Sequence, residues 1–500
     1  MSKHYTANQR IEQVKNKLIV AIDVGKRDLH VKYMKADRTV YNKKAFCFRN
    51  SIRGLKDLLD HTEEMGKAAG LDECVFAMEP TGHYWLNLAA KLDDMDFLVV
   101  TVNQSHTKNA GEIIDGSQKK DDDKDPEGIG LLTALGDYTP YYRPEGVYAE
   151  IRKAYRMLEG CTEETTRCTN QLHGYLDKHL PGYESCFGKG NGVTSALSLA
   201  VLKKAAFPED ILDLGEEGIL GIWKEAGLRG TKCRAEKLIS VIRGNKAYAI
   251  TDGADTARCE LGFLIRKLEL AMETEAAAEE QVRKTVVMIP GAQHLLKIKG
   301  VSYRTAAGFF AIVGDLKQRF SNAAQLVKLA GLNIIAQSSG SHRGESRISK
   351  RGCPELRTAL YRVLTALLEN TPAFKPLREH FMKRSDNPLK AIQANVALCT
   401  KLLRIFYALV VHDEDFDEKK MLGDIKRMDS GKVSSATVEA GKLTNQLDRI
   451  LYGAKGQEIT IEVIGNIQEI SKALKGLVAA AERGSMKEAV LGAASAADGG

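Results

Sequence analysis

The chain has 500 residues, which is too long for one ordinary hydrophobic core and predicts three or four structural units. Its composition is 44% hydrophobic and 27% charged, and no run approaches the roughly 18 apolar residues of a membrane span, so we expect no membrane partner. No apolar stretch precedes Leu18, and the nine cysteines form no C-x-x-C pair, which predicts a cytoplasmic protein without a zinc ribbon.

The net charge of +7 is unevenly distributed along the chain. Residues 341–404 contain thirteen Lys or Arg against five Asp or Glu, a surplus of eight, whereas residues 405–500 contain twelve against fifteen. A basic segment of this kind is typical of a phosphate-binding surface, although a solvated helical face has the same composition.

The first 100 residues contain the strand patterns. The apolar run LIVAIDV at 18–24 is rich in β-branched residues and ends at Gly25, and LHVKYM at 29–34 alternates like a hairpin partner. A third strand over 39–47, a helix over 52–66, the buried strand CVFAME at 74–79, a helix over 85–95 and the strand FLVVTV follow. This order predicts an α/β domain.

The remaining sequence reads as mostly helical. Residues 148–284 contain two long stretches with apolar residues at spacings of three and four, which predict a pair of antiparallel helices around a Gly-rich helical insertion at 181–256. In the third unit, GVS at 300–302 joins two apolar helices like a helix-hairpin-helix, which offers backbone N–H groups to phosphates. We expect the last dozen residues to be disordered. The fold class is therefore α/β plus all-α.

Two carboxylates stand at strand ends. Asp23 closes the first strand and Glu79 follows a later one, and such carboxylates on neighbouring strands can hold a hard divalent cation through oxygen ligands. Asp122 and Asp125 stand three apart in KKDDDKDPEG at 119–128, at a predicted helix start, so both share one helix face. A helix cap in a solvated charge run is the alternative for this stretch taken alone.

Taken together, the four carboxylates suit a two-metal arrangement for phosphodiester cleavage. Mg²⁺ is favoured over Zn²⁺ because every candidate ligand is an oxygen.

A loop rich in Ser and Gly lies within the basic segment. The chain reads SSGSHRGESRISKRG at 338–352, with Arg343, Arg347, Lys350 and Arg351 around the serines. Such a loop could present a hydroxyl group to a phosphate whose charge the cations neutralise. A loop that grips phosphate without covalent chemistry is the alternative, and composition alone favours it.

These segments together resemble the DEDD transposases of the insertion-sequence one-ten family over roughly residues 18–410. IVAIDVGKRDLHV, MEPTGHYW and KDDDKDPEGIGLL resemble the motifs of its RuvC-like domain. IKGVSYRTAAGFFAIVGDLKQRFSNAAQLVKLAGL, SSGSHRGESRISKRGCPELRTALY and VALCTKLLRIFYALV resemble its transposase domain.

The resemblance implies four regions. These are a RuvC-like, RNase-H-like catalytic domain at 18–140, a helical coiled-coil region with an insertion at 141–285, a serine-containing transposase domain at 286–411, and a helical to disordered tail at 412–500.

The resemblance also implies roles for individual residues. Asp23, Glu79, Asp122 and Asp125 become the metal carboxylates, and Ser339 becomes the nucleophile, with Ser338 as the alternative because the two serines are adjacent. We expect the nucleic acid to be bound by Lys299, Gly300, Ser302, Arg343, Arg347, Lys350, Arg351 and Arg357.

In the resembling family, a serine hydroxyl attacks a DNA phosphodiester to form a phosphoserine link while the carboxylates hold Mg²⁺. The site combines domains of two protomers in a tetramer that carries a bridge RNA pairing with target and donor DNA. We therefore expect donor and target DNA, a structured guide RNA and a homo-oligomer, from dimer to tetramer, as partners.

Two other functions fit parts of the sequence. A metal-dependent Holliday-junction nuclease that uses water would need only the carboxylates, and it leaves the serine loop unexplained. A non-catalytic nucleic-acid scaffold would need only the basic helices, and the intact carboxylates argue against it.

Overall fold

The computed structural model describes residues 7–115, 123–188, 191–335, 338–339, 342–343, 347–384 and 388–423. The backbone forms two compact units. The larger unit comprises Met1–Leu296, Ser302–Ala359 and Phe406–Asp413, and the smaller comprises Lys297–Val301, Leu360–Ile405 and Glu414–Gly500. Asp122 and the C-terminal dozen residues expected to be disordered lie outside the described residues.

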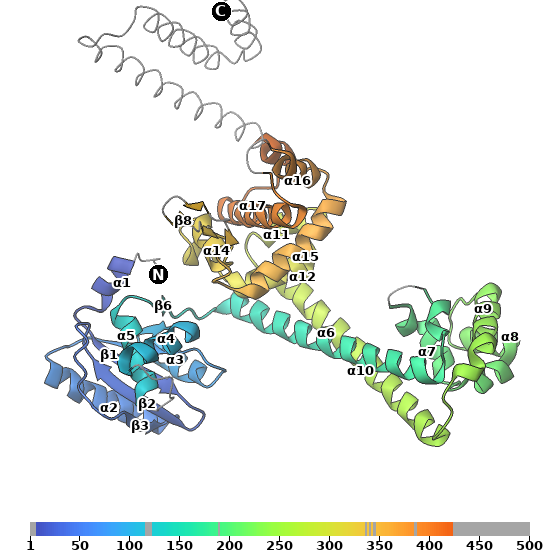
Figure 1. Ribbon diagram of the computed structural model, residues 1–500, viewed down its shortest axis with the longest axis horizontal. Coiled ribbons are helices and arrows are strands. Elements are labelled where there is room, and N and C mark those ends of the chain that lie inside the picture. The colour runs from blue at the N-terminus through green and yellow to red at the C-terminus, as the bar shows by residue number, and fades with distance from the viewer. Residues whose placement is uncertain are drawn as a thin grey trace, which may run out of the picture. The chain divides into compact units, whose positions relative to one another are not determined.

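A six-stranded mixed sheet forms the N-terminal part of the larger unit (Figure 1). The central strand β1 pairs in parallel with β4 and antiparallel with β2; β4 and β5 are parallel, and both edge strands are antiparallel to their neighbours. In spatial order the strands are β3 (Phe46–Arg49), β2 (Asp28–Met34), β1 (Leu18–Val24), β4 (Cys74–Met78), β5 (Leu98–Thr101) and β6 (Thr139–Pro140).

Helices cover both faces of this sheet, and the alternation of each strand decides which side chains meet them. Leu18, Val20 and Ile22 of β1 pack with α2 (Ile52–Ala69) and α3 (Trp85–Asp94). Ile19 and Ala21 pack on the opposite face. That face is covered by α1 (Ala7–Val14), α4 (Gln104–Asp115) and α5 (Lys124–Ala134). The prediction of an α/β N-terminal region is confirmed.

The predicted third strand over 39–47 is wrong in its bounds. Only Val40 makes an isolated bridge, to Met34, and the strand β3 begins at Phe46. The side-chain amide of Asn42 explains the break. Its Oδ1 accepts from Tyr33 N at 2.8 Å and its Nδ2 donates to Val31 O at 3.0 Å, so a side chain takes hydrogen bonds that a continuous strand would make through its backbone.

Two long helices, α6 (Gly146–His179) and α10 (Ala254–Val286), follow the sheet domain. Thr162 Oγ1 donates to Glu275 Oε1 at 2.7 Å, and Lys267 Nζ donates to Gln171 Oε1 at 3.4 Å. The later contact residue on α6 pairs with the earlier contact residue on α10, so the two helices are antiparallel, as expected.

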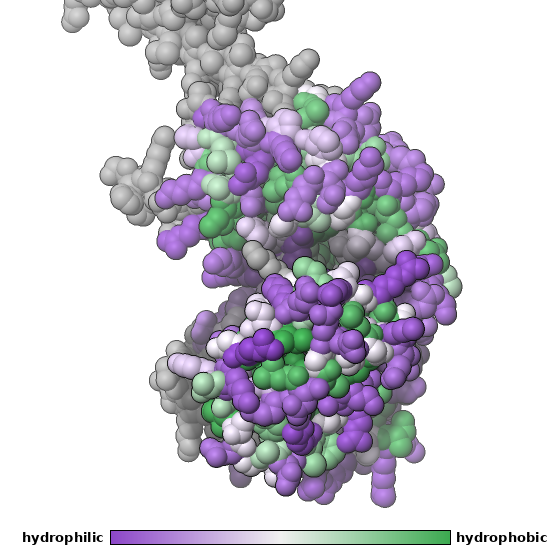
Figure 2. All heavy atoms as spheres, turned by 90° about the vertical axis from the view of Figure 1, so that its right-hand side faces the viewer, coloured by the Kyte–Doolittle hydropathy of each residue, from purple (hydrophilic) through white to green (hydrophobic). Residues whose placement is uncertain are grey.

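The Gly-rich insertion between them is a helical subdomain with its own core. It contains α7 (Ala196–Leu202), α8 (Pro208–Glu225) and α9 (Lys232–Asn245). Trp223 is fully buried, and its Nε1 donates to Leu197 O at 2.8 Å. Figure 2 faces the α8 and α9 side of the molecule and shows hydrophilic and hydrophobic side chains intermixed there. The expected helical insertion is thus more regular than its glycines indicated.

The C-terminal part is mostly helical, as expected. Its helices are α11 (Ala292–Leu296), α12 (Tyr303–Val313), α13 (Leu316–Arg319), α14 (Ala323–Leu329), α15 (Pro354–Asn370), α16 (Phe374–Lys383) and α17 (Ala391–His412). Among the described helices, α17 is the one long and apolar enough to span a membrane by composition, but half of its most apolar stretch is buried, and core helices of soluble proteins pass the same test.

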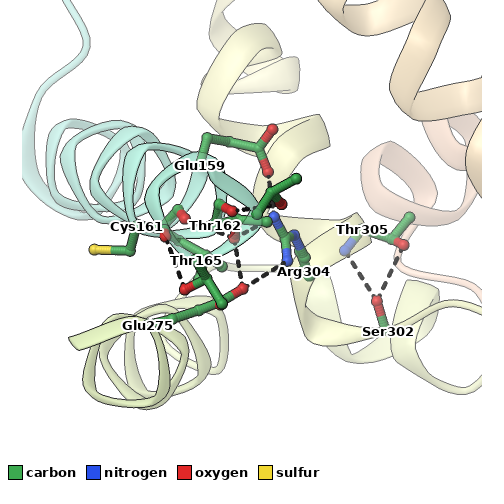
Figure 3. Close-up of polar contacts among 10 residues, drawn as sticks. Glu159, Cys161, Thr162, Thr165, Glu275, Ser302, Arg304 and Thr305 are labelled. Carbon is green, nitrogen blue, oxygen red and sulfur yellow. Dashed lines mark hydrogen bonds and ion pairs between the residues drawn. The ribbon is translucent and has the colours of Figure 1, made fainter. Parts of the chain in front are cut away.

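One arginine joins α12 to both long helices. Arg304 donates from Nη2 to Glu159 Oε1 of α6 at 2.8 Å and to Thr162 Oγ1 at 2.8 Å, and its Nη1 lies 3.7 Å from Glu275 Oε1 of α10 (Figure 3). Its charge is balanced by two carboxylates. This contact fixes the start of α12 against the helix pair.

Candidate active site

Asp23 and Glu79 are level with one another at the same edge of the sheet. Ile22 of β1 is in register with Met78 of β4, so the next residue on each parallel strand is a carboxylate. Neighbouring strands lie about 4.8 Å apart, which brings the two carboxylates within reach of a common cation.

Strand alternation also assigns both carboxylates to one face. Asp23 follows the alternation of Ile19 and Ala21, and Glu79 follows that of Val75 and Ala77, all of which pack on the α5 side. Both carboxylates are half-buried. Thr81 Oγ1 donates to Glu79 Oε1 at 2.6 Å and so orients this carboxylate.

The helix α5 directs a third carboxylate to this edge. Glu127 Oε2 accepts from Lys32 Nζ at 2.5 Å, and Lys32 is in register with Ala21. Three residues later, Gly130 packs so closely on Met34, the register partner of Ile19, that a Cβ there would overlap its sulfur atom. Therefore α5 runs antiparallel to β1.

The first turn of α5 consequently lies at the end of β1 that carries Asp23. Asp125 belongs to this turn and is half-buried. The neighbouring Asp123 accepts a hydrogen bond from the backbone N–H of Ala45, which ties the approach to α5 to the segment before β3.

The expected metal ligands are thus brought together in part. Asp23, Glu79 and the acidic start of α5 share one edge and one face, and Asp122 lies outside the described residues. Over the part of the chain that the structure describes, no three His, Cys, Asp or Glu side chains are grouped closely enough to hold a metal ion. The donors present are all oxygens, which fits Mg²⁺.

The two candidate serines lie on a β-hairpin between α14 and α15. Strand β7 (Ile334–Ile335) pairs antiparallel with β10 (Arg347–Ile348), and β8 (Ser338–Ser339) pairs antiparallel with β9 (His342–Arg343). Ser339 is in register with His342. The connecting residues 336–337, 340–341 and 344–346 lie outside the described residues.

The base of this serine hairpin is held by close backbone contacts. Lys350 N donates to Gly331 O at 3.0 Å, and Cys353 N donates to Leu329 O at 2.7 Å. Arg357 donates from Nη1 to Ala330 O at 2.9 Å. It therefore joins the two ends of the hairpin, a role that the expectation of nucleic-acid binding did not include.

The other residues expected to bind nucleic acid lie in two places. Arg347, Lys350 and Arg351 are exposed at the serine hairpin. Lys299 is exposed in the connection before α12, and Gly300 there has a φ of 102°. Ser302 caps α12, its Oγ accepting from Thr305 N at 3.2 Å (Figure 3). The side chain of Arg343 lies outside the described residues.

Two protein-family models match the chain in sequence order. One, described as a transposase of the DEDD IS110 type, covers residues 20–181, and one described as Transposase IS116/IS110/IS902 family covers residues 292–378. Over these two segments the chain is similar to that transposase family. The first matched segment contains the four expected carboxylates and the second contains the serine hairpin, whereas the α7–α9 subdomain lies between them.

Two curated relatives match the chain. It is 30% identical over 201 residues to the transposase for insertion sequence element IS1111A of Coxiella burnetii, which covers 40% of this chain and 54% of that protein. It is 23% identical over 314 residues to a protein of the IS117 mini-circle of Streptomyces coelicolor, which covers 61% of this chain and 73% of that protein. The chain thus spans about half the length of the Coxiella relative.

The ion pair between Lys32 and Glu127 beside these carboxylates is not among the features predicted from the sequence. The side chain of Lys32 is 5% exposed and that of Glu127 is 26% exposed. Lys32 lies among apolar residues in β2, and this pattern could have predicted an ion pair because a buried charge requires a partner.

Proposed function

We propose that this chain is a DNA transposase that cuts and rejoins strands with a serine nucleophile and Mg²⁺. The observation that carries the proposal is the register of β1 and β4, which sets Asp23 and Glu79 side by side on the face covered by α5. Carboxylates arranged in this way serve phosphodiester chemistry rather than stability, because two like charges at one sheet edge repel each other.

The proposed ligands of Mg²⁺ are Asp23, Glu79, Asp122 and Asp125, on a RuvC-like, RNase-H-like domain. Bound Mg²⁺ supplies positive charge that offsets the charge developing on a phosphate under attack. The chain itself contributes the fixed positions: hydrogen-bonded sheet strands hold Asp23 and Glu79, and the Lys32–Glu127 ion pair holds the first turn of α5.

The proposed nucleophile is Ser339, with Ser338 as the alternative. Its Oγ forms a bond to the phosphorus atom of a DNA phosphodiester, and the bond from phosphorus to one sugar oxygen breaks. The serine proton ends on the released sugar hydroxyl. The energy of the broken bond is retained in the phosphoserine ester, so rejoining needs no external energy source.

The proposal includes three kinds of partner. Donor and target DNA are the substrates, a structured guide RNA selects them by base pairing, and further copies of the chain complete a composite site in a dimer or tetramer. The basic segment at 341–404 supports backbone binding of this kind, since most contacts to a guided duplex are to phosphate.

Strand cleavage by an Asp23→Asn variant tests the metal site. We expect cleavage of DNA in Mg²⁺ to fall by about 100-fold or more, because a lost metal ligand removes a few kcal/mol of transition-state stabilisation. The matched control is Asp28→Asn, an exposed carboxylate on β2 that pairs with Arg49 at 3.0 Å. Normal cleavage by the Asp23 variant would contradict the proposal.

A further inference from the structure

The packing of α6 against α12 places an arginine pair beside the serine hairpin. Along α6, Glu159 bonds to Arg304 at the start of α12, and Tyr155 lies against Gly308, where a Cβ would be 2.9 Å from the tyrosine oxygen. The helices are therefore antiparallel. One turn closer to the start of α6, Arg152 is level with the C-terminal end of α12.

A second arginine already occupies the end of α12. Arg319 donates from Nη1 to Ile312 O at 3.1 Å and to Val313 O at 2.8 Å, and its guanidinium lies 4.2 Å from the ring centre of Tyr142. Burial lowers the pKa of Arg319, and the charge of Arg152 lowers it further. The helix-end carbonyl groups are thus taken by Arg319, and Arg152 adds a second positive charge next to them.

Arg152 and Arg156 differ from the other arginines that help to hold this fold. Arg304, Arg258 and Arg143 each pair with a carboxylate. Arg152 is half-buried and Arg156 is exposed, and within the described parts of the chain neither makes a hydrogen bond or an ion pair. Burial lowers the pKa of Arg152, and Arg156 lowers it further, yet a guanidinium stays protonated at neutral pH.

A half-buried charge without a counterion lowers the stability of the fold. Binding an anion beside such a charge offsets that cost in free energy. Cys353, at the base of the serine hairpin, lies near enough to Arg152 and Arg319 for its thiolate form to oppose the lowering of the pKa of each. The exposed Lys350 and Arg351 lie three and two residues before it. Positive charge from α6, α13 and the hairpin therefore gathers at one place.

We infer that Arg152 and Arg156 bind a backbone phosphate of the DNA strand that enters beside the base of the serine hairpin. Their spacing of four residues puts both on one face of α6, and planar guanidinium groups suit phosphate oxygens. The inference rests on the proposed function, because that function brings DNA to the hairpin. The inferred phosphate site positions the DNA strand and lies on α6, which contains neither the proposed metal ligands nor the candidate serines.

The test is the salt dependence of DNA binding. A fluorescently labelled duplex of mixed sequence is titrated with the full-length chain at several KCl concentrations without divalent ions. Each phosphate contact contributes about 0.9 to the slope of log affinity against log salt. We expect Arg156→Gln to reduce the slope by about 0.9 and Arg152→Gln to act in the same direction. Lys224→Gln, an exposed lysine on α8 of the helical subdomain, is the matched control and should leave the slope unchanged.

Equal slopes for the Arg156 and Lys224 variants would overturn the inference, as would an effect seen only with a structured RNA probe. Arg156 is exposed, so its replacement does not endanger folding and carries the test even where the Arg152 variant unfolds. Binding in the absence of Mg²⁺ is independent of cleavage. If the wild-type chain binds duplex DNA in this way but transfers no strands, only the proposed function is contradicted. If it binds no duplex DNA, the proposed function and the inference about Arg152 and Arg156 are both overturned.

Discussion

Lys32 shows how a single residue supports the candidate site without touching substrate. Its side chain is 5% exposed in the middle of the sheet, and it forms an ion pair with Glu127 of α5. We expect Glu127→Gln to lower the free energy of unfolding by about 1–3 kcal/mol, because the lysine keeps its charge and loses its carboxylate.

Urea unfolding of the two proteins measures this difference. The control is Glu63→Gln, which removes an exposed pair with Lys67 on α2 and should leave stability unchanged. A Glu127 variant as stable as the wild type would mean that the pair does not hold α5 against the sheet.

At the scale of elements, Asp210 fixes the α7–α9 subdomain at the start of α8. Its carboxylate accepts from Ala206 N at 2.8 Å and from Phe207 N at 3.0 Å, and it pairs with Arg258 at 2.6 Å. Burial raises the pKa of Asp210, but the hydrogen bonds from Arg258, Ala206 and Phe207 outweigh it and leave the pKa below 3.8.

The pH dependence of stability follows from that shift. A lowered pKa in the folded state contributes stability that is present above the unfolded pKa of about 3.9 and is lost as pH falls through the lower folded value. We expect Asp210→Asn to be less stable than the wild type at neutral pH, with the difference shrinking below pH 4. Thermal unfolding from pH 7 to pH 3 measures it, and a difference independent of pH would contradict the assignment.

The elements that the sequence predicts well are those with a strong apolar pattern. The strands β1 and β4 are buried runs rich in β-branched residues, and their ends correctly locate Asp23 and Glu79. Their register and shared face depend on pairing between residues 56 positions apart, such as Ile22 and Met78, which no local pattern reports. The third strand was misplaced because the side chain of Asn42 replaces backbone hydrogen bonds.

The serine hairpin and the helical subdomain show the opposite case. Strands of two residues such as β8 and β9 are too short to show an alternating apolar pattern, and their Ser- and Gly-rich sequence predicts a loop. In the insertion, the glycines in and around α8 weaken the helical sequence pattern, so the hydrophobic core around Trp223 is not predicted from the sequence. Arg357, which we expect to bind nucleic acid, also bonds to the hairpin base, a contact that its charge alone does not indicate.

At the scale of the whole molecule, the proposed reaction requires both matched segments. Residues 20–181 contain the carboxylates and residues 292–378 contain the serine hairpin. A metal-dependent nuclease would need only the first segment, with water as its nucleophile. A serine transposase needs both, and the two functions leave different products on DNA.

The most direct measurement is a search for a covalent link between protein and DNA. Labelled DNA is incubated with the full-length chain, its co-purified RNA and Mg²⁺, and then separated by denaturing electrophoresis. We expect a slow band that protease removes, present for the wild type and for Ser338→Ala and absent for Ser339→Ala. Loss of the band in the Ser338 variant alone would contradict the assignment of Ser339. Cleavage by the wild-type chain without any such band would contradict the serine mechanism and make water the nucleophile.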